Sequence, residues 1–363
     1  MGSSSSADQP AGEVDLEGII NVDLLRSWMD DHHLESGPFR RFHAIGGGTQ
    51  NVMLGFERGE RRFVLRRGPR HLRPTTNFVL AREIRILNAL RDTAVPHPHL
   101  IAGSTDERLM NGSAFYLMDP IEGFNAANEL PPLHLGSAQV RQQMGLAMID
   151  AAAALGEIDY HSVGLANLGQ PDGFLERQVP RWLTELHSYR RYENYPASGL
   201  PNIDTVADWL DDNTPQSCRP GIMHGDFHVA NVMFDLDGPE VVAVVDWEMC
   251  TIGDPLLDVG WLLATWPHPD QPGGIGDSAL ARAGNVVSAK ELIDRYAQRS
   301  DRDVSDMRWY TVLACLKLGV LLEGTFARAC AGLADPGVGQ HLHRLAQQLL
   351  RRASMLVDGA DLL

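Results

Sequence analysis

One short stretch of the chain concentrates side chains that bind metal ions or move protons. The segment 224–231 reads HGDFHVAN, and Asp246 begins the tripeptide DWE further along. Asp246 follows the apolar run Val241–Val245, so we expect its carboxylate at a strand end, where it can emerge from the core into a cleft. A turn at Asp237-Gly238 separates this run from Val232–Phe234. The pattern predicts a β-hairpin that brings Asp246 near Asn231.

These residue types suit the transfer of a phosphoryl group. Asp246 and Asn231 offer the carboxylate and amide oxygens that Mg²⁺ prefers, and such transfer depends mainly on positioning and on these ions. Asp226 and Asn231 have the separation of the aspartate and asparagine in the HRDxxxxN loop of phosphoryl-transfer enzymes. A second carboxylate can orient the acceptor hydroxyl and take its proton, and Asp226 is the natural candidate for this role.

Two other interpretations of the same segment remain open at this point. His224, Asp226 and His228 are all legitimate zinc ligands, so a mononuclear zinc site is one of them. The other is a polar loop with no chemistry. Neither interpretation explains the asparagine and the strand-end aspartate that follow. We expect His224 to fix the loop by hydrogen bonds rather than to transfer a proton.

The pattern HGDxHxxN, a hairpin, DWE and then GDPLLD at 253–258 resembles the aminoglycoside phosphotransferase and choline kinase family, whose fold is that of protein kinases. The resemblance covers residues 38 to 350, and its most specific part is the HGD to DWE block. It implies an α+β fold with two lobes, a small β-rich N-lobe and a larger, mainly helical C-lobe. It also implies ATP and Mg²⁺ as cofactors.

The resemblance carries roles to particular residues. Asp226 would be the catalytic aspartate, and Asn231 and Asp246 would be the Mg²⁺ ligands. The segment 63–66 (FVLR) resembles the third strand of the small lobe, and Glu83 would pair with its cation. That cation is Arg66, where many kinases have lysine. Arginine keeps its charge and can bridge phosphate oxygens and Glu83, although a solvated strand charge is the alternative.

Two further segments would contact the nucleotide. The phosphate-covering loop would comprise Gly46, Gly47, Gly48, Thr49 and Asn51. This loop lacks the GxGxxG spacing, and no GxxxxGK[ST] motif occurs, so a flexible turn is its alternative interpretation. Met118, Asp119 and Ile121 would meet adenine through backbone groups at the interlobe hinge. An apolar strand end followed by a proline turn would look the same without a nucleotide.

Periodicity along the chain predicts the elements that position these residues. Helical spacing marks 22–29, 78–90, 144–158, 181–195, 206–210 and 338–357, and alternation marks strands within 42–67 and at 115–118. We expect a disordered N-terminus at 1–14, a nucleotide-binding N-lobe at 15–119, and a C-lobe at 120–363 that holds the catalytic loop, the metal site and the acceptor site. The small polar residues of the first segment cannot bury enough apolar surface to order it.

Composition restricts the class of partner. The net charge of −16 over 363 residues opposes non-specific binding to nucleic acid or to an anionic membrane. No run approaches the ~18 continuous apolar residues of a membrane helix, and the start, MGSSSSADQP, lacks a secretory signal pattern. Four scattered cysteines indicate reduced thiols, so we expect a cytoplasmic protein. With 29 arginines and two lysines, Lys290 and Lys317, any reactive cation before Lys290 must be arginine or histidine.

The sequence says least about which molecule accepts the phosphoryl group. The stretch 177–195 is rich in arginine and tyrosine, which suits either an amphipathic helix or a surface facing an anionic acceptor. Together with GLANLG at 164–169, it resembles the branch related to kinase domains fused to acyl-CoA dehydrogenases. We therefore expect a small-molecule hydroxyl as acceptor, with a hydroxyacyl compound as one possibility. A nucleotide-binding pseudokinase is the alternative, and the short Asp246–Asp258 interval disfavours a protein kinase. The role of Glu248 stays open.

Overall fold

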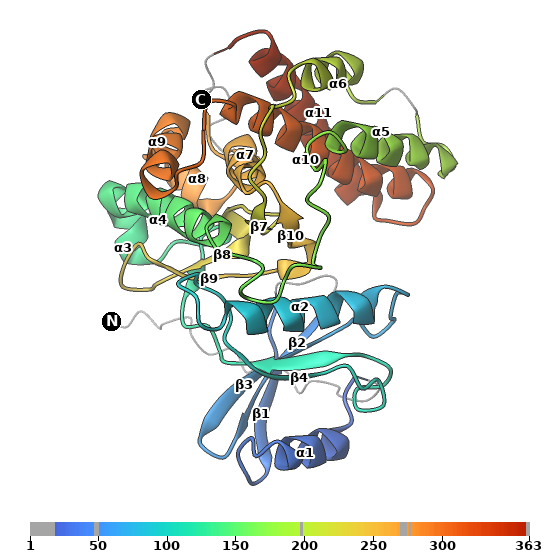
Figure 1. Cartoon of the computed structure of the whole chain (residues 1–363). Helices are drawn as coiled ribbons and strands as arrows, with labels where there is room; N and C mark the ends of the chain where they lie inside the picture. The colour runs from blue at the N-terminus through green and yellow to red at the C-terminus, as the bar shows by residue number, and fades with distance from the viewer. Residues whose placement is uncertain (1–18, 47–50, 197–198, 269–273, 276, 361–363) are drawn as a thin grey trace, which may run out of the picture. The chain divides into compact units, whose positions relative to one another are not determined.

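The computed structural model describes residues 19–46, 51–196, 199–268, 274–275 and 277–360. The predicted disordered segment 1–14 and the loop residues Gly47, Gly48 and Thr49 lie outside this part of the chain. The chain divides into two compact units (Figure 1). The first extends to Asp92 and includes His97–Ile121, and the second comprises Thr93–Pro96 and the chain from Glu122 onward.

The first unit is built on a five-stranded sheet in which every neighbouring pair is antiparallel, with the order β1-β2-β3-β5-β4. Its elements are α1 (Val22–Asp31), β1 (Phe39–Ala44), β2 (Val52–Arg58), β3 (Arg61–Arg67), α2 (Thr76–Leu90), β4 (Leu100–Ser104) and β5 (Phe115–Met118). The registers pair Arg66 with Tyr116 across β3 and β5, which places both side chains on the same face.

Alternation along these strands creates two different faces. Leu54, Phe56, Phe63, Leu65 and Leu117 pack with Trp28 and Met29 of α1 in one apolar cluster. The opposite face is the one that bears Arg66 and Tyr116, and α2 covers it with the buried side chains of Leu80, Glu83, Ile86, Leu87 and Leu90. The period of two in the strands therefore delivers Arg66 to the helix that carries Glu83.

The second unit is mainly helical. Its helices are α3 (Pro132–Gly136), α4 (Ala138–Gly156), α5 (Gln178–Ser188), α6 (Ile203–Asp212), α7 (Leu256–Thr265), α8 (Ala279–Ala283), α9 (Ala289–Arg299), α10 (Met307–Cys330) and α11 (Pro336–Val357). Helix α10 packs against α5, α6, α7 and α11. Among the helices of the described residues, α10 is the one that is long and apolar enough to cross a membrane. However, 72% of its most apolar window is buried inside the protein.

Two small sheets in the second unit position the loops of interest. Strand β7 (Gly221–Met223) pairs with β10 (Thr251–Gly253), and β8 (Val232–Phe234) lies between β6 (Phe124–Asn125) and β9 (Val241–Val244). Three-residue 3-10 turns follow in the loops, η2 at Val229–Asn231 and η3 at Trp247–Met249, and η1 at Tyr189–Arg191 follows α5. The segment 224–231 is therefore the connection between the two sheets.

The architecture confirms the predicted α+β fold, with a β-rich first part and a mainly helical remainder. Two local predictions differ from the structure. The helix expected over 181–195 ends at Ser188 and continues only as the turn η1. Strands β4, β6, β7 and β10 were not predicted. Strands β6, β7 and β10 have only two or three residues each, and β4 reads LIAGS, which is poor in β-branched residues.

Candidate active site

The loop 224–231 takes a conformation that only glycine can adopt at its second position. Gly225 has φ of +87°, and a Cβ atom there would lie 2.5 Å from the carbonyl oxygen of Met249. Glycine tolerates both the left-handed backbone and this close approach. The glycine of HGD thereby sets the direction in which the chain presents Asp226.

Asp226 is held by partners within the same loop. The Asn231 amide donates hydrogen bonds to the Asp226 carboxylate and to its backbone carbonyl, both at 2.9 Å. Nε2 of His228 lies 3.3 Å from the other carboxylate oxygen. Burial on its own would raise the pKa of Asp226, but these polar partners outweigh it and lower the pKa to about 2. The carboxylate is therefore ionised at neutral pH and ready to accept a hydrogen bond from a hydroxyl.

The hairpin brings Asp246 to Asn231. Val232 pairs with Val244 in the β8–β9 register, and the N–H of Val245 donates to the Asn231 carbonyl at 2.9 Å. Asp246 is the next residue and has φ of 66° and ψ of 66°, a left-handed conformation that is uncommon for a residue with a side chain. Such backbone geometry is concentrated at functional sites.

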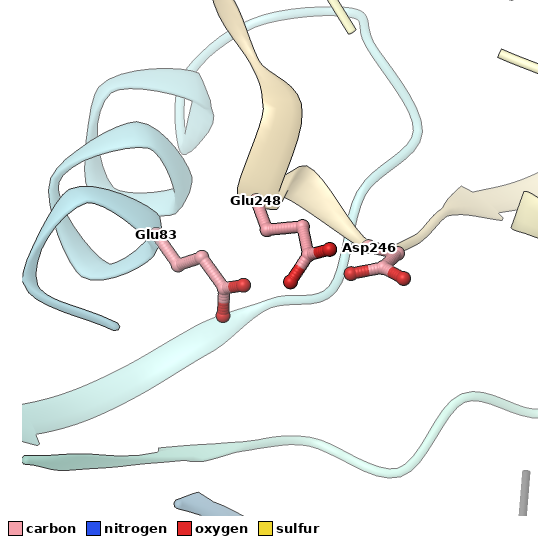
Figure 2. A group of neighbouring side chains, drawn as sticks. All are labelled: Glu83, Asp246 and Glu248. Carbon is pink, nitrogen blue, oxygen red and sulfur yellow. The ribbon is translucent and has the colours of Figure 1, made fainter. Parts of the chain in front are cut away.

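Glu248 adds a second carboxylate on this turn. A carboxylate oxygen of Glu248 lies within 4.8 Å of one of Asp246. Figure 2 shows Asp246 and Glu248 at the turn after β9, and it also draws Glu83, which extends from helix α2 of the first unit. In the second unit, the carboxylate oxygens of Asp246 and Glu248 thus lie close enough to share a cation. Oxygen-only ligand sets suit Mg²⁺.

His224 supports this loop in the neutral state. The imidazole is fully buried, its Nε2 donates to the Val245 carbonyl at 2.9 Å, and its Nδ1 accepts from the N–H of Asp226 at 3.3 Å. Burial lowers the pKa of His224 to about 4. Both ring nitrogens are occupied by the protein itself, which leaves no lone pair for zinc. Among the described residues, His224, Asp226 and His228 also do not form a group with convergent ligand atoms, so the zinc interpretation is wrong.

A buried pair of opposite charges holds the loop from behind. The Asp258 carboxylate accepts from the N–H groups of His224 at 2.5 Å and Gly225 at 2.8 Å, while Nζ of Lys317 donates to the Gly225 carbonyl at 2.9 Å. Lys317 also lies 4.4 Å from the Trp261 ring centroid. Burial raises the pKa of Asp258 to about 6 and lowers the pKa of Lys317 to about 8, so both groups are charged between these values. The backbone N–H and the backbone carbonyl of Gly225 are thereby both held.

The first unit contains the predicted ion pair. Arg66 donates to a Glu83 oxygen at 2.8 Å, and the Tyr116 hydroxyl donates to the other oxygen at 3.1 Å. Side-chain exposure is 11% for Arg66 and 1% for Glu83, so the interpretation of Arg66 as a solvated strand charge is wrong. The sheet register and the period of α2 produce this pair, because they direct both residues to one face.

The predicted hinge segment lies at the end of β5. Met118 is its last residue, and Asp119 and Ile121 follow. The N–H of Asp119 donates to the His99 carbonyl at 3.1 Å, and its carboxylate accepts from Arg61 at 2.8 Å and lies 2.6 Å from Nδ1 of His99. Asp119 thus has partners within its own unit. Gly46 and Asn51 belong to the described residues, while the rest of the predicted phosphate-covering loop does not.

Comparison with known proteins agrees with this architecture. A family model described as the phosphotransferase enzyme family matches residues 41–299, and the chain belongs to this family. Its neighbours among solved structures share the kinase-like two-lobed fold.

Three particular relatives give the range of similarity. The chain is 27% identical over 314 residues to acyl-CoA dehydrogenase family member 11 of Gallus gallus, covering 84% of this chain but only 39% of that relative. A Ralstonia eutropha JMP134 protein, provisionally named an aminoglycoside phosphotransferase, is 27% identical with a TM-score of 0.76, covering 92% of this chain and 98% of that one. Aminoglycoside phosphotransferase APH(4)-Ia, solved with AMP-PNP and hygromycin B, has a TM-score of 0.56 at 16% identity, with 88% and 98% covered. At that identity, the likeness concerns the fold alone.

Sequence reasoning missed one participant in the site and described another only loosely. Lys317 was not singled out, although a single cation within the apolar run of α10 is a signal of a partnered buried charge. Asp258 was noted only as part of the GDPLLD motif, whereas its carboxylate binds the backbone of the catalytic loop. Both contacts join segments more than 30 residues apart, which spacing cannot reveal.

Proposed function

We propose that this protein is an ATP- and Mg²⁺-dependent kinase that transfers the γ-phosphoryl group to a hydroxyl of a small molecule. Membership of the phosphotransferase family supports the class of reaction. The main support for ATP- and Mg²⁺-dependent transfer to a hydroxyl is the arrangement of Asp226, Asn231 and Asp246. An ionised carboxylate, the amide that binds it and a strand-end carboxylate are joined by one hairpin. The AMP-PNP complex of APH(4)-Ia, a protein of the same fold, supports a nucleoside triphosphate as donor.

Each residue then has a distinct task. Asp226 orients the acceptor hydroxyl through a hydrogen bond and receives its proton as the bond to phosphorus forms. Asn231, Asp246 and Glu248 would hold Mg²⁺, which neutralises charge on the phosphate oxygens when bound. Arg66, kept in place by Glu83, would contact phosphate oxygens of the nucleotide with its guanidinium. Gly46, Asn51 and the backbone of 118–121 would contribute further to nucleotide binding.

The proposal extends to organisation and location. We assign nucleotide binding to the first unit and the catalytic loop, metal site and acceptor site to the second. A cytoplasmic location is proposed as well, supported by four free cysteine thiols, of which Cys250 and Cys315 are buried. Thiols persist in reducing compartments.

The test is Mg²⁺-dependent ADP release with a panel of aminoglycosides, amino alcohols, sugars and hydroxyacyl compounds. Asp226→Asn should reduce stimulated release by at least about 100-fold, because the amide cannot take a proton. Asp246→Ala should abolish Mg²⁺-dependent ADP release while leaving the fold intact. Asp237→Asn is the matched control, since Asp237 is exposed in the turn of the same hairpin, and it should retain activity.

The outcomes separate the enzyme from a pseudokinase. Stimulated release that is lost in Asp226→Asn and kept in Asp237→Asn supports the kinase. Unchanged turnover in Asp246→Ala would contradict the metal assignment. If ATP binds and no acceptor class stimulates release, the chain acts as a nucleotide-binding protein without turnover.

A further inference from the structure

A small pocket opens beside the catalytic loop. Its volume is about 120 Å³, and its walls belong entirely to the second unit. The loop contributes His228, Val229 and Ala230, and the remaining wall comes from the end of α7, from α8 and from the residues around them. The pocket is therefore attached to the same loop that presents Asp226.

The described wall of this pocket is mainly apolar. Its apolar members include Ala230, Trp266, Ile275, Leu280 and Ala281, and among the described residues no carboxylate, lysine or arginine side chain lines it. Three of its polar side chains are already hydrogen-bonded within the protein. The Thr265 hydroxyl donates to the Trp261 carbonyl at 3.1 Å, Ser278 Oγ accepts from the N–H of Ala281 at 3.1 Å, and the Trp266 indole donates to the Val287 carbonyl at 2.8 Å.

One side chain connects the pocket to the reacting centre. His228 lines the pocket, and its Nε2 lies 3.3 Å from the Asp226 carboxylate. The pocket and the Asp226 carboxylate are therefore joined through one imidazole.

We propose that this pocket binds a hydrocarbon part of the acceptor, so that the preferred substrates are alcohols carrying a short alkyl group. The inference rests on the proposed kinase function and names its substrate class. A cavity of about 150 Å³ lined by aliphatic and aromatic side chains binds benzene, so this pocket accommodates about four or five carbons. An aminoglycoside would direct hydroxyl and ammonium groups into it, and such groups bury unfavourably without a partner.

Binding of straight-chain primary alcohols from ethanol to octanol tests the pocket directly. Each added methylene should tighten binding about fourfold until the pocket is full near pentanol, and affinity should then level off. Ligand-observed NMR or calorimetry provides this readout without turnover. The same alcohols, offered with Mg²⁺ and ATP, should show the same order of kcat/KM for ADP release.

Variants of α8 tie the effect to this site. Ala281→Leu fills the pocket and should weaken pentanol binding at least tenfold while changing ethanol binding less than twofold. Ala283→Leu, on the same short helix but outside the pocket, is the matched control and should bind like the unaltered protein. Leu280→Ala enlarges the pocket and should move the optimum to a longer alcohol, which keeps the test decisive if Ala281→Leu fails to fold.

The results distinguish this inference from the kinase proposal. Binding that does not depend on chain length, or identical effects of Ala281→Leu and Ala283→Leu, overturns the pocket assignment even if ADP release is observed. Kanamycin-stimulated release that Ala281→Leu leaves unchanged overturns the substrate class. Length-dependent binding without ADP release from any alcohol overturns the acceptor role of the pocket, while the kinase function itself is decided by the acceptor panel.

Discussion

His224 is neutral because the protein occupies both of its ring nitrogens. Nε2 must carry the proton to donate to the Val245 carbonyl, and Nδ1 must lack one to accept from the N–H of Asp226. A second proton would break the latter hydrogen bond and bury a charge. The residue thus connects the start of the catalytic loop to the strand end that carries Asp246. Both hydrogen bonds of this connection require a neutral imidazole.

This predicts a specific dependence of stability on pH. The pKa of His224 is about 4 when folded and 6.5 as a model value, so below pH 6.5 the unfolded chain takes up a proton that the folded chain refuses. The stabilisation is complete above pH 6.5 and is lost as pH falls toward 4, by up to about 3 kcal/mol. Asp258, with a folded pKa of about 6, gives the opposite trend between pH 4 and 6 and obscures the effect in a single profile.

The comparison with His224→Gln isolates the histidine, because Asp258 is present in both proteins. The difference in free energy of unfolding should be largest at pH 7 and should shrink by up to about 3 kcal/mol near pH 4. Urea denaturation at pH 4.5, 5.5 and 7 measures it. Parallel pH profiles of the two proteins would show that His224 is not buried in the neutral state.

At the scale of elements, helix α10 supports the catalytic loop across a long distance in sequence. Lys317 is embedded among apolar neighbours, yet its ammonium reaches the Gly225 carbonyl and faces the ring of Trp261. Its charge also lowers the pKa of Asp258 relative to burial alone. The packing of α10 against α7 therefore places an anion at the N–H and a cation at the carbonyl of one residue, Gly225.

Replacing this lysine tests the support. Lys317→Met should lower the free energy of unfolding by about 3 kcal/mol, because it leaves the buried Asp258 carboxylate without its compensating charge and the Gly225 carbonyl without its donor. The pKa of Asp258 should rise above its value of about 6, since the nearby positive charge is gone. Chemical denaturation measures the free energy of unfolding. As the pH is lowered, turnover should begin to fall at a higher pH in Lys317→Met than in the unaltered protein.

The matched control is Lys290→Met, which removes the only other lysine in the sequence. Lys290 is exposed and pairs with Asp294 one turn along α9. Exposed pairs of this kind contribute about 0.5 kcal/mol at most. Equal effects of the two substitutions would mean that Lys317 acts through general charge and not through the loop.

At the scale of the whole molecule, ligand binding changes the stability of the folded protein. A ligand that binds only the folded protein stabilises it by mass action, by about 2.7 kcal/mol at a hundred times its Kd. If Asn231, Asp246 and Glu248 hold Mg²⁺, the stabilisation by ATP must depend on the metal. The net charge of −16 adds to this dependence, because a nucleotide without Mg²⁺ is itself strongly anionic.

We therefore expect ATP with Mg²⁺ to raise Tm more than ATP with EDTA. The difference should disappear in Asp246→Ala, and differential scanning fluorimetry measures all four conditions. Asp237→Asn should behave like the unaltered protein. An equal rise in Tm with Mg²⁺ and with EDTA would contradict a metal-dependent nucleotide site.

The sequence by itself determined the features that depend on neighbouring residues. The order and spacing of HGDFHVAN, the hairpin and DWE predict that Asn231 and Asp246 lie close together, because antiparallel strands joined by a tight turn have one register. Alternation in β3 predicts that Arg66 and Arg67 face opposite sides of the sheet. The structure buries Arg67 completely and pairs Arg66 with Glu83.

Only the tertiary structure decided the features that join distant segments. The contact of Lys317 with Gly225 spans 92 residues, and that of Asp258 with His224 spans 34. The hydrocarbon pocket needs α8 beside the loop at His228, which follows from the hydrogen bond of the Leu280 N–H to the Ala126 carbonyl. Such contacts depend on how whole elements pack, and side-chain spacing within one segment carries no information about them.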